Sequence, residues 1–256
     1  MFTTNHPPFW GRARYNTAPK PIAAIRYIMR IAALDDDPHQ LVALALIIRD
    51  AGFSFKPYNT AKEFLTDIRR ESFDAVLMDW VLGDSNGLEV VKTLRANPDL
   101  TRLPVLFMTV KDEERDVVEA LNAGGDDFLN KPVRAAELIA RIKAVTRRLS
   151  PGTDDAKTYE FDRFKFDLRQ QQCWADGELI DLTQKEFNLA IVLLQNIGRA
   201  LSRGYLLERV WGRETEVPSR TMDTHVSRVR TRLDLRPEKG YLLSPVYSYG
   251  YRLEKL

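Results

Sequence analysis

Cysteine is almost absent from this sequence, which has one thiol, Cys173, among its 256 residues. A lone cysteine excludes an intrachain disulfide and is consistent with a reducing cytoplasm. Long apolar runs are missing too, because the longest, residues 41–48, falls well short of the roughly 18 residues of a membrane span. The sequence also shows no internal repeat and no low-complexity tract. We therefore expect a cytoplasmic globular protein of one or two domains, without a membrane partner.

Charge of one sign does not dominate the chain either, since the net charge is only +2. Residues 1–28 carry four basic and no acidic residues, residues 29–148 carry 17 and 20, and residues 149–256 carry 17 and 16. A nearly neutral C-terminal part neither supports nor excludes nucleic-acid binding. That question depends on where its arginines lie.

Residues 1–28 contain four prolines and show no hydrophobic periodicity before Ile22. Two interpretations of this segment stay open: a disordered basic extension, or sequence that precedes a true start at Met29. A secretory signal is not expected, because Arg26 and Arg30 interrupt the only apolar stretch.

Segments of strand type alternate with segments of helix type from residue 29 to residue 148. We expect strands near residues 30–34, 53–57, 75–78, 104–109 and 127–130, and helices near residues 38–51, 61–70, 87–97, 112–123 and 134–148. This alternation predicts an α/β domain of the doubly wound, flavodoxin-like (βα)5 type. Its sheet is parallel, with helices on both faces and strand order 2-1-3-4-5. Residues 149–157 break all periodicity and are interpreted as a linker.

Residues 158–256 predict a second, α+β domain. The expected elements are strand-type segments at 159–168 and 172–182, helices at 187–195, 202–211 and 219–233, and a terminal hairpin at 241–253. Asp176-Gly177 is a hairpin signal, and Thr183-Gln-Lys-Glu186 is a capping box that opens the first helix. Two helices joined by a polar loop and followed by a hairpin describe a winged helix-turn-helix.

Four carboxylates follow two of the expected strands. Asp35, Asp36 and Asp37 end the first strand, and Asp79 ends the third. These strands are neighbours in a doubly wound sheet, so their acids converge. Like charges close together are costly unless a cation lies among them, and carboxylates are ligands that Mg²⁺ prefers. The alternative is a helix cap. Asp37 fits that role, but three acids beside Asp79 exceed what capping requires.

Two further strand ends add a hydroxyl and an ammonium to this edge of the sheet. Thr109 ends the fourth strand, and Lys131 follows the fifth. An acceptor carboxylate, a metal site, a hydroxyl and a lysine suit the receipt of a phosphoryl group. The metal and the lysine would neutralise the charge that builds on the transferring oxygens.

At these residues the chain resembles the receiver domain of bacterial two-component response regulators, over residues 30–148. Its winged-helix half is similar to the OmpR/PhoB subfamily. The resemblance implies that a sensor histidine kinase phosphorylates Asp79. It also implies that Asp36, Asp79 and the backbone carbonyl of Val81 bind Mg²⁺ directly, while Asp35 acts through water.

The resemblance further implies a switch around the phosphoryl group. Thr109 would be the switch hydroxyl, and Lys131, with a cis peptide bond after it, would sense the phosphate. Phe128 fills the place of the family's rotating aromatic residue, which is usually Tyr. Gly83 replaces a usual Pro, and Val110 replaces a usual Ala. We expect a competent site with an altered phosphate lifetime, including slower hydrolysis behind Val110.

The helix from Ser219 carries an apolar stripe with arginine and hydroxyl side chains opposite it. By itself this pattern is also typical of a solvated helix, but the winged-helix context favours the major groove. The expected DNA contacts on this helix are Arg220, Thr224, His225, Ser227, Arg228, Arg230 and Thr231. In the wing, Tyr247 stands where relatives often carry Arg, which predicts weaker minor-groove recognition. Glu214 and Glu216 are candidate contacts to RNA polymerase.

Charged residues on the face of the fourth helix, fifth strand and fifth helix resemble the pairs that dimerise the subfamily. They are Asp126, Asp127, Glu137, Arg141 and Arg148. Phosphorylation adds about −1.5 to −2 charges. The resemblance implies that Thr109 then moves inward, Phe128 follows, and this face is remodelled. A phosphorylated homodimer would bind promoter DNA at direct repeats roughly one helical turn apart.

Two other functions stay open. A metal-dependent phosphatase would use Asp79 as nucleophile, but Val81 stands two residues later, where such an enzyme needs a second acid–base group. A constitutive DNA-binding protein would contain a receiver that does not switch. We expect a phosphorylation-activated regulator rather than an enzyme. The response of the protein to acetyl phosphate or beryllofluoride distinguishes these three functions.

Overall fold

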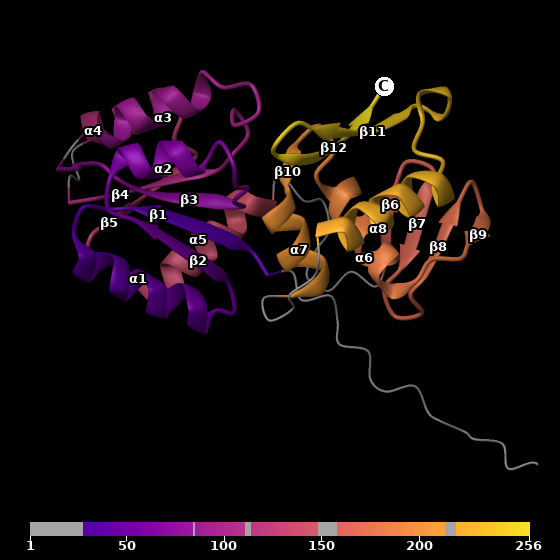
Figure 1. Cartoon of the computed structure of the whole chain (residues 1–256). Helices are drawn as coiled ribbons and strands as arrows, with labels where there is room; N and C mark the ends of the chain where they lie inside the picture. The colour runs from indigo at the N-terminus through magenta and orange to yellow at the C-terminus, as the bar shows by residue number, and fades with distance from the viewer. Residues whose placement is uncertain (1–27, 84, 111–113, 148–157, 213–218) are drawn as a thin grey trace, which may run out of the picture.

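The computed structural model describes residues 28–83, 85–110, 114–147, 158–212 and 219–256, which fold into two domains (Figure 1). The predictions made for the chain before Ile28, for the linker at 149–157 and for Glu214 and Glu216 lie outside these residues. Within the described ranges, no helix is both long enough and apolar enough to cross a membrane.

A parallel sheet forms the centre of the first domain. Its strands are β1 (Arg30–Leu34), β2 (Ser54–Tyr58), β3 (Ala75–Asp79), β4 (Val105–Thr109) and β5 (Asp127–Asn130). β1, β3 and β4 are buried along their whole length, as expected of strands that are covered on both faces. The strand order is β2-β1-β3-β4-β5 with every pair parallel, which confirms the predicted doubly wound fold.

Helices cover both faces of this sheet. They are α1 (Pro38–Asp50), α2 (Ala61–Asp67), α3 (Gly87–Arg95), α4 (Glu114–Asn122) and α5 (Ala135–Arg147). Leu44 of α1 and Ile142 of α5 lie in one apolar cluster, and Phe64 of α2 and Val90 of α3 lie in the other. Figure 1 accordingly shows α1 below the sheet and α2, α3 and α4 above it.

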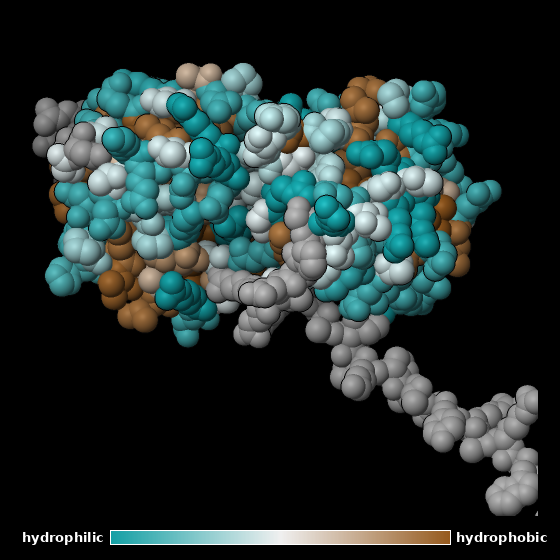
Figure 2. Space-filling view, in the orientation of Figure 1, coloured by the Kyte–Doolittle hydropathy of each residue, from teal (hydrophilic) through white to brown (hydrophobic). Residues whose placement is uncertain are grey.

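The outer side of α1 keeps apolar side chains in solvent. Val42 and Leu46, four residues apart on this helix, are 62% and 68% exposed. Figure 2 shows hydrophobic residues gathered at the lower edge of the first domain, where α1 lies in Figure 1. The helix is therefore apolar on its core side and partly apolar on its solvent side.

The second domain begins with an antiparallel sheet. Its strands, in order, are β6 (Thr158–Phe161), β7 (Phe164–Asp167), β8 (Gln172–Ala175) and β9 (Glu178–Ile180). Each strand-type segment predicted from the sequence thus contains two strands. Asp176 and Gly177 connect β8 to β9 with φ values of 52° and 86°, the left-handed backbone that a tight hairpin requires.

The rest of this domain is the predicted winged helix. It contains α6 (Gln184–Gln195), β10 (Ala200–Ser202), α7 (Arg203–Trp211), α8 (Ser219–Arg232), the short 3-10 helix η1 (Pro237–Lys239), β11 (Tyr241–Val246) and β12 (Gly250–Lys255). The capping box between Thr183 and Glu186 is present at the start of α6. β10 was not predicted. It pairs with β12, where a Cβ on Gly250 would lie 2.1 Å from the carbonyl oxygen of Leu201.

Candidate functional site

Asp79 is the last residue of β3 and lies at the carboxyl edge of the parallel sheet, with 7% of its surface exposed. The start of α3 packs directly against it, because a Cβ on Gly87 would lie 2.1 Å from the carbonyl oxygen of Asp79. Burial raises the pKa of the Asp79 carboxyl, and the ammonium of Lys131 opposes that shift. The fold therefore presents a desolvated carboxylate whose ionised form is favoured by one neighbouring cation.

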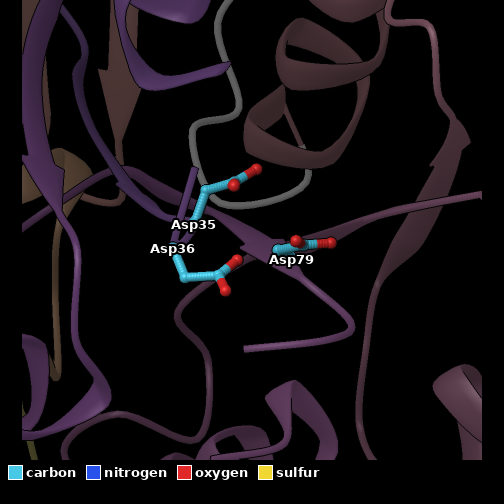
Figure 3. Close-up of side chains that lie close together, drawn as sticks. All are labelled: Asp35, Asp36 and Asp79. Atoms are coloured by element: carbon cyan, nitrogen blue, oxygen red, sulfur yellow. The ribbon is translucent and has the colours of Figure 1, made fainter. Parts of the chain in front are cut away.

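Two more carboxylates reach Asp79 from the end of β1. Carboxylate oxygens of Asp35, Asp36 and Asp79 all lie within 4.8 Å of one another (Figure 3). Asp35 is fully buried and accepts a hydrogen bond of 3.0 Å from the backbone N–H of Asp37, whereas Asp36 is exposed. Asp37 itself caps α1, as predicted. Three hard oxygen donors at this spacing fit a divalent cation such as Mg²⁺, which would offset their repulsion.

Lys131 completes the acidic cluster from the segment after β5. Its ammonium lies 2.9 Å from Asp35 and 3.0 Å from Asp79. Burial alone would lower the pKa of Lys131, but hydrogen bonds and attraction from these two carboxylates raise it above its ordinary value. The peptide bond between Lys131 and Pro132 is cis, as the family resemblance implied. The structure thus brings together the acceptor, two acids and the lysine that the sequence singled out.

The switch residues lie on β4, which pairs with β3, and on β5, which pairs with β4. Thr109 ends β4 and is buried, and its carbonyl accepts a 2.7 Å hydrogen bond from the backbone N–H of Lys131. Phe128, in β5, is half-buried and packs against the apolar cluster on the α3 side of the sheet. A hydroxyl and an aromatic side chain therefore lie on adjoining strands.

The residues that depart from the family pattern surround the same edge. Val110 follows Thr109 and is 75% exposed. Val81, whose carbonyl is a predicted metal ligand, lies in the loop after Asp79 and forms a β-bridge with Asn86. A Cβ on Gly83 would lie 3.1 Å from a carboxylate oxygen of Asp36. A bulkier residue at position 83 would therefore press on a predicted metal ligand.

Comparison with known proteins gives the family. A model described as "Response regulator receiver domain" matches residues 31–143, and one described as "Transcriptional regulatory protein, C terminal" matches residues 177–253. The chain is 35% identical over 227 residues to the sensory transduction protein RegX3 of Mycolicibacterium smegmatis, covering 88% of this chain and 98% of that relative. This chain belongs to the OmpR/PhoB family of two-component response regulators.

Other members of the family are similar over the same length. The DNA-binding response regulator MtrA of Mycolicibacterium smegmatis is 32% identical over 223 residues, covering 87% of this chain and 96% of MtrA. The crystal structure of DrrB, a Thermotoga maritima OmpR/PhoB homologue, covers 89% of this chain and 99% of its own at 27% identity, with a TM-score of 0.43. The present response regulator therefore joins a receiver domain to a DNA-binding domain and regulates transcription.

The DNA-binding domain of this response regulator exposes the face of α8 that the sequence indicated. Met222, Val226 and Val229 are buried in its core. The exposed side chains of the helix are those of Arg220, Thr224, Ser227, Arg228, Thr231 and Arg232. Two of the hydroxyls hydrogen-bond to carbonyls of the preceding turn, Thr224 to Arg220 and Thr231 to Ser227, at 3.0 and 3.1 Å. A surface of cations and short polar groups therefore faces solvent along α8.

Three other predicted DNA contacts have different surroundings. His225 is half-buried, with its ring edge-on to Trp211 at 5.2 Å and Nδ1 2.8 Å from the carbonyl of Thr221. Arg230 donates from Nε to the carbonyl of Leu243 in β11, which ties α8 to the wing. Tyr247, at the wing tip, is 97% exposed. These contacts give His225 and Arg230 a structural role within the domain.

The acidic and basic residues of the predicted dimer face pair within one chain in this structure. Arg141 bonds to both carboxylate oxygens of Asp127 at 3.0 Å and to Glu137 at 2.8 Å. Asp126 pairs with Arg95 at 2.9 Å. Arg148 lies outside the described residues. A dimer that used the same charges between chains would have to exchange these internal pairs.

Sequence analysis missed the residues through which the two domains touch. The strongest signal was Asp74, an acid directly before the apolar run of β3, and it is 2% exposed. A buried carboxylate requires partners. Those partners, Tyr205, Arg199 and Arg209, lie more than 120 residues away, and only the docked arrangement of the domains identifies them.

Proposed function

We propose that Asp79 is the phosphoacceptor of this response regulator and that its phosphorylation controls binding to promoter DNA. The observation that carries the proposal is the position of Asp79. It is buried at the end of β3, 3.0 Å from the ammonium of Lys131, with its oxygens within 4.8 Å of those of Asp35 and Asp36.

Phosphoryl transfer needs a nucleophile and a way to neutralise charge. A carboxylate oxygen of Asp79 forms the new P–O bond with the phosphohistidine of the sensor kinase, the P–N bond breaks, and the imidazole nitrogen keeps the electron pair. Asp35, Asp36, Asp79 and the carbonyl of Val81 would hold Mg²⁺, which when bound neutralises charge on the phosphoryl oxygens. Lys131 supplies a second fixed positive charge beside Asp79.

The phosphoryl group then becomes a ligand for the switch. The hydroxyl of Thr109 and the ammonium of Lys131 bind its oxygens, Phe128 follows Thr109, and the face of α4, β5 and α5 changes shape. Two receivers then pair through the charges of Asp126, Asp127, Glu137, Arg141 and Arg148. The dimer places two α8 helices on direct repeats and contacts RNA polymerase through Glu214 and Glu216.

Acetyl phosphate tests the first step directly. Intact-mass measurement of the full chain with acetyl phosphate and Mg²⁺ should show one added phosphoryl group. Asp79→Asn, or removal of Mg²⁺ with EDTA, should abolish the gain. Asp50→Asn, which removes an exposed carboxylate at the end of α1, should retain it. A phosphorylated Asp79→Asn protein would refute the assignment.

The same preparation separates the alternative functions. Dimerisation and tighter DNA binding on treatment with beryllofluoride support the regulator. Continuous release of phosphate from p-nitrophenyl phosphate would support a phosphatase. DNA binding that is unchanged by beryllofluoride would support a constitutive DNA-binding protein.

A further inference from the structure

The contact between the two domains holds the base of the wing beside the receiver. The backbone N–H of Ser72, in the segment before β3, donates to Oγ of Ser202 in β10 at 3.1 Å, and the backbone N–H of Ser202 donates to Oγ of Ser72 at 2.8 Å. The hydroxyls of Ser72 and Tyr249 are 2.9 Å apart. Figure 1 shows β10 beside the first domain at this junction. Since Tyr249 lies in the turn between β11 and β12, that turn has a fixed place beside the receiver.

The tip of the same turn stays open to solvent. Tyr247, its first residue, is 97% exposed. The outer side chains of α8, among them Arg220 and Arg228, are exposed as well. The receiver therefore covers neither the wing tip nor the exposed face of α8, and both surfaces are accessible while the domains are docked.

A cleft of about 210 Å³ lies between the receiver and the wing. On the receiver side it is lined by the turn after α2 and by the loop between α3 and β4, which contribute Arg69 and Asn97. On the other side it is lined by Tyr247 and Tyr249 of the wing turn. A receiver arginine and the wing tip therefore border one cleft, although they are far apart in the sequence.

Most of the charge in this cleft is already paired. The charged residues that line it are Arg69, Glu71, Asp99 and Arg199. Glu71 pairs with Arg30 of β1 at 2.7 Å, and Asp99 pairs with Arg252 of β12 at 2.6 Å. Arg199 lies 3.6 Å from a carboxylate oxygen of Asp74. The two carboxylates of the cleft are therefore neutralised by arginines that lie outside its lining.

Arg69 differs from these residues, because no carboxylate among the residues that the structure describes forms an ion pair with it. It follows α2, and its side chain is exposed. The wing turn on the other side of the cleft, residues 247–249, has no charged side chain. The cleft thus places one uncompensated cation next to an uncharged wing tip.

We propose that Arg69 is a DNA contact, through which the receiver binds a backbone phosphate beside the wing. Phosphate backbones form the walls of the minor groove, which is only about 6 Å wide. A wing tip that meets this groove therefore brings the other side of its cleft close to one backbone. A guanidinium binds phosphate oxygens through two parallel hydrogen bonds. The receiver then supplies the cation that residues 247–249 lack, and the domains stay docked on DNA. This inference rests on the DNA-binding role of the winged helix.

Arg69→Ala in the full chain tests this contact. The probe is a fluorescein-labelled DNA duplex of mixed sequence, titrated at several salt concentrations. We expect binding about fivefold weaker at low salt, and a slope of log K against log salt lowered by about 0.9, the value for one phosphate. Lys62→Ala is the matched control, because it removes one positive charge from an exposed position at the other end of α2. An equal loss in both variants would reflect net charge alone and would overturn the proposal.

A reversible crosslink tests whether the docked arrangement binds DNA. The reciprocal hydrogen bonds place residues 72 and 202 close enough for a disulfide in the full chain carrying Ser72→Cys and Ser202→Cys. The native Cys173 does not compete, because it is buried and burial raises its thiol pKa to about 12. The oxidised and reduced forms should bind the duplex equally, and Arg69→Ala should weaken binding by the oxidised form about fivefold as well. Failure to form the crosslink, or loss of DNA binding on oxidation, would refute a contact made by docked domains.

Arg220→Ala, on the exposed face of α8, separates this inference from the proposed function. If Arg220→Ala weakens binding and Arg69→Ala does not, the winged helix binds DNA and only the receiver contact is wrong. A wild-type chain that does not bind the duplex at low salt would contradict both.

Discussion

Val110 is a single exposed side chain that directly follows the buried Thr109, with 75% of its surface exposed. We propose that it adds bulk where water must approach a phosphoryl group on Asp79, in a place where the family usually has Ala. Val110→Ala should therefore speed dephosphorylation. A barrier lowered by about 1 kcal/mol corresponds to about fivefold in rate. Phosphate loss is followed by intact mass after acetyl phosphate is removed. Val118→Ala, an exposed valine of α4, is the control, and identical rates in wild type and Val110→Ala would contradict the prediction.

Glu186 makes the stability of the DNA-binding domain depend on pH. Burial alone would raise the pKa of this carboxyl, but its hydrogen bonds with Thr183 and the charges of Arg232 and Arg228 lower it below the ordinary 4.5. The unfolded chain therefore binds more protons in acid than the folded one. The stability that Glu186 contributes is complete above pH 4.5 and is lost as the pH falls through its folded pKa.

Glu186→Gln isolates that charge, because glutamine retains the capping-box hydrogen bond. We expect a loss of about 1 kcal/mol at pH 7, since a hydrogen bond to a charged group exceeds a neutral one by about that amount. The difference from wild type should shrink as the pH falls below 4.5. Urea unfolding of both proteins from pH 7 to pH 3 measures this difference in the free energy of unfolding. Glu178→Gln, at an exposed position in β9, is the control, and a difference independent of pH would rule out the ion pairing.

At the scale of elements, α8 has a stripe that is buried and a face that is exposed, which suits insertion into a groove. Arg220 lies on the exposed face. Arg220→Ala should weaken duplex binding and, if it neutralises one phosphate, lower the slope of log K against log salt by about 0.9. Fluorescence titrations at several salt concentrations measure both. Arg169→Ala, in the turn between β7 and β8, removes the same charge elsewhere, and an equal loss there would exclude a specific role for α8.

Elements with strong local signals were predictable. The Asp-Pro start of α1, the capping box of α6 and the Asp-Gly turn are encoded by neighbouring residues, and each lies where expected. β10 was missed because its three residues form a strand only by pairing with β12, some fifty positions later.

The candidate site was predictable from the expected sheet. Asp79, Asp35, Thr109 and Lys131 could be grouped because strand ends in a parallel sheet meet at one edge. The partners of Asp74 could not be identified in this way. Neither a period nor a motif indicates which surface of the second domain packs against Asp74, so this residue looked like the polar end of an apolar strand.

At the scale of the whole molecule, the contact between the domains and the acidic cluster lie at opposite ends of one strand, because Asp74 precedes β3 and Asp79 ends it. The acidic cluster is therefore separated from the second domain by the length of β3. We propose that a phosphorylated dimer would supply two winged helices to adjacent repeats, where the second would bind at a high effective concentration.

Three polar residues of the receiver, Ser72, Asp74 and Asp99, also bear on protein engineering. Domain exchange treats receivers and winged helices as interchangeable cassettes joined at the linker. A hybrid that joins this winged helix to a foreign receiver lacking these three residues loses the contacts to Tyr249, Tyr205 and Arg252. We expect the two domains of such a hybrid to separate more readily than those of the native chain. Small-angle X-ray scattering of both proteins would measure the difference, and a biosensor built by splicing at residues 149–157 would inherit it.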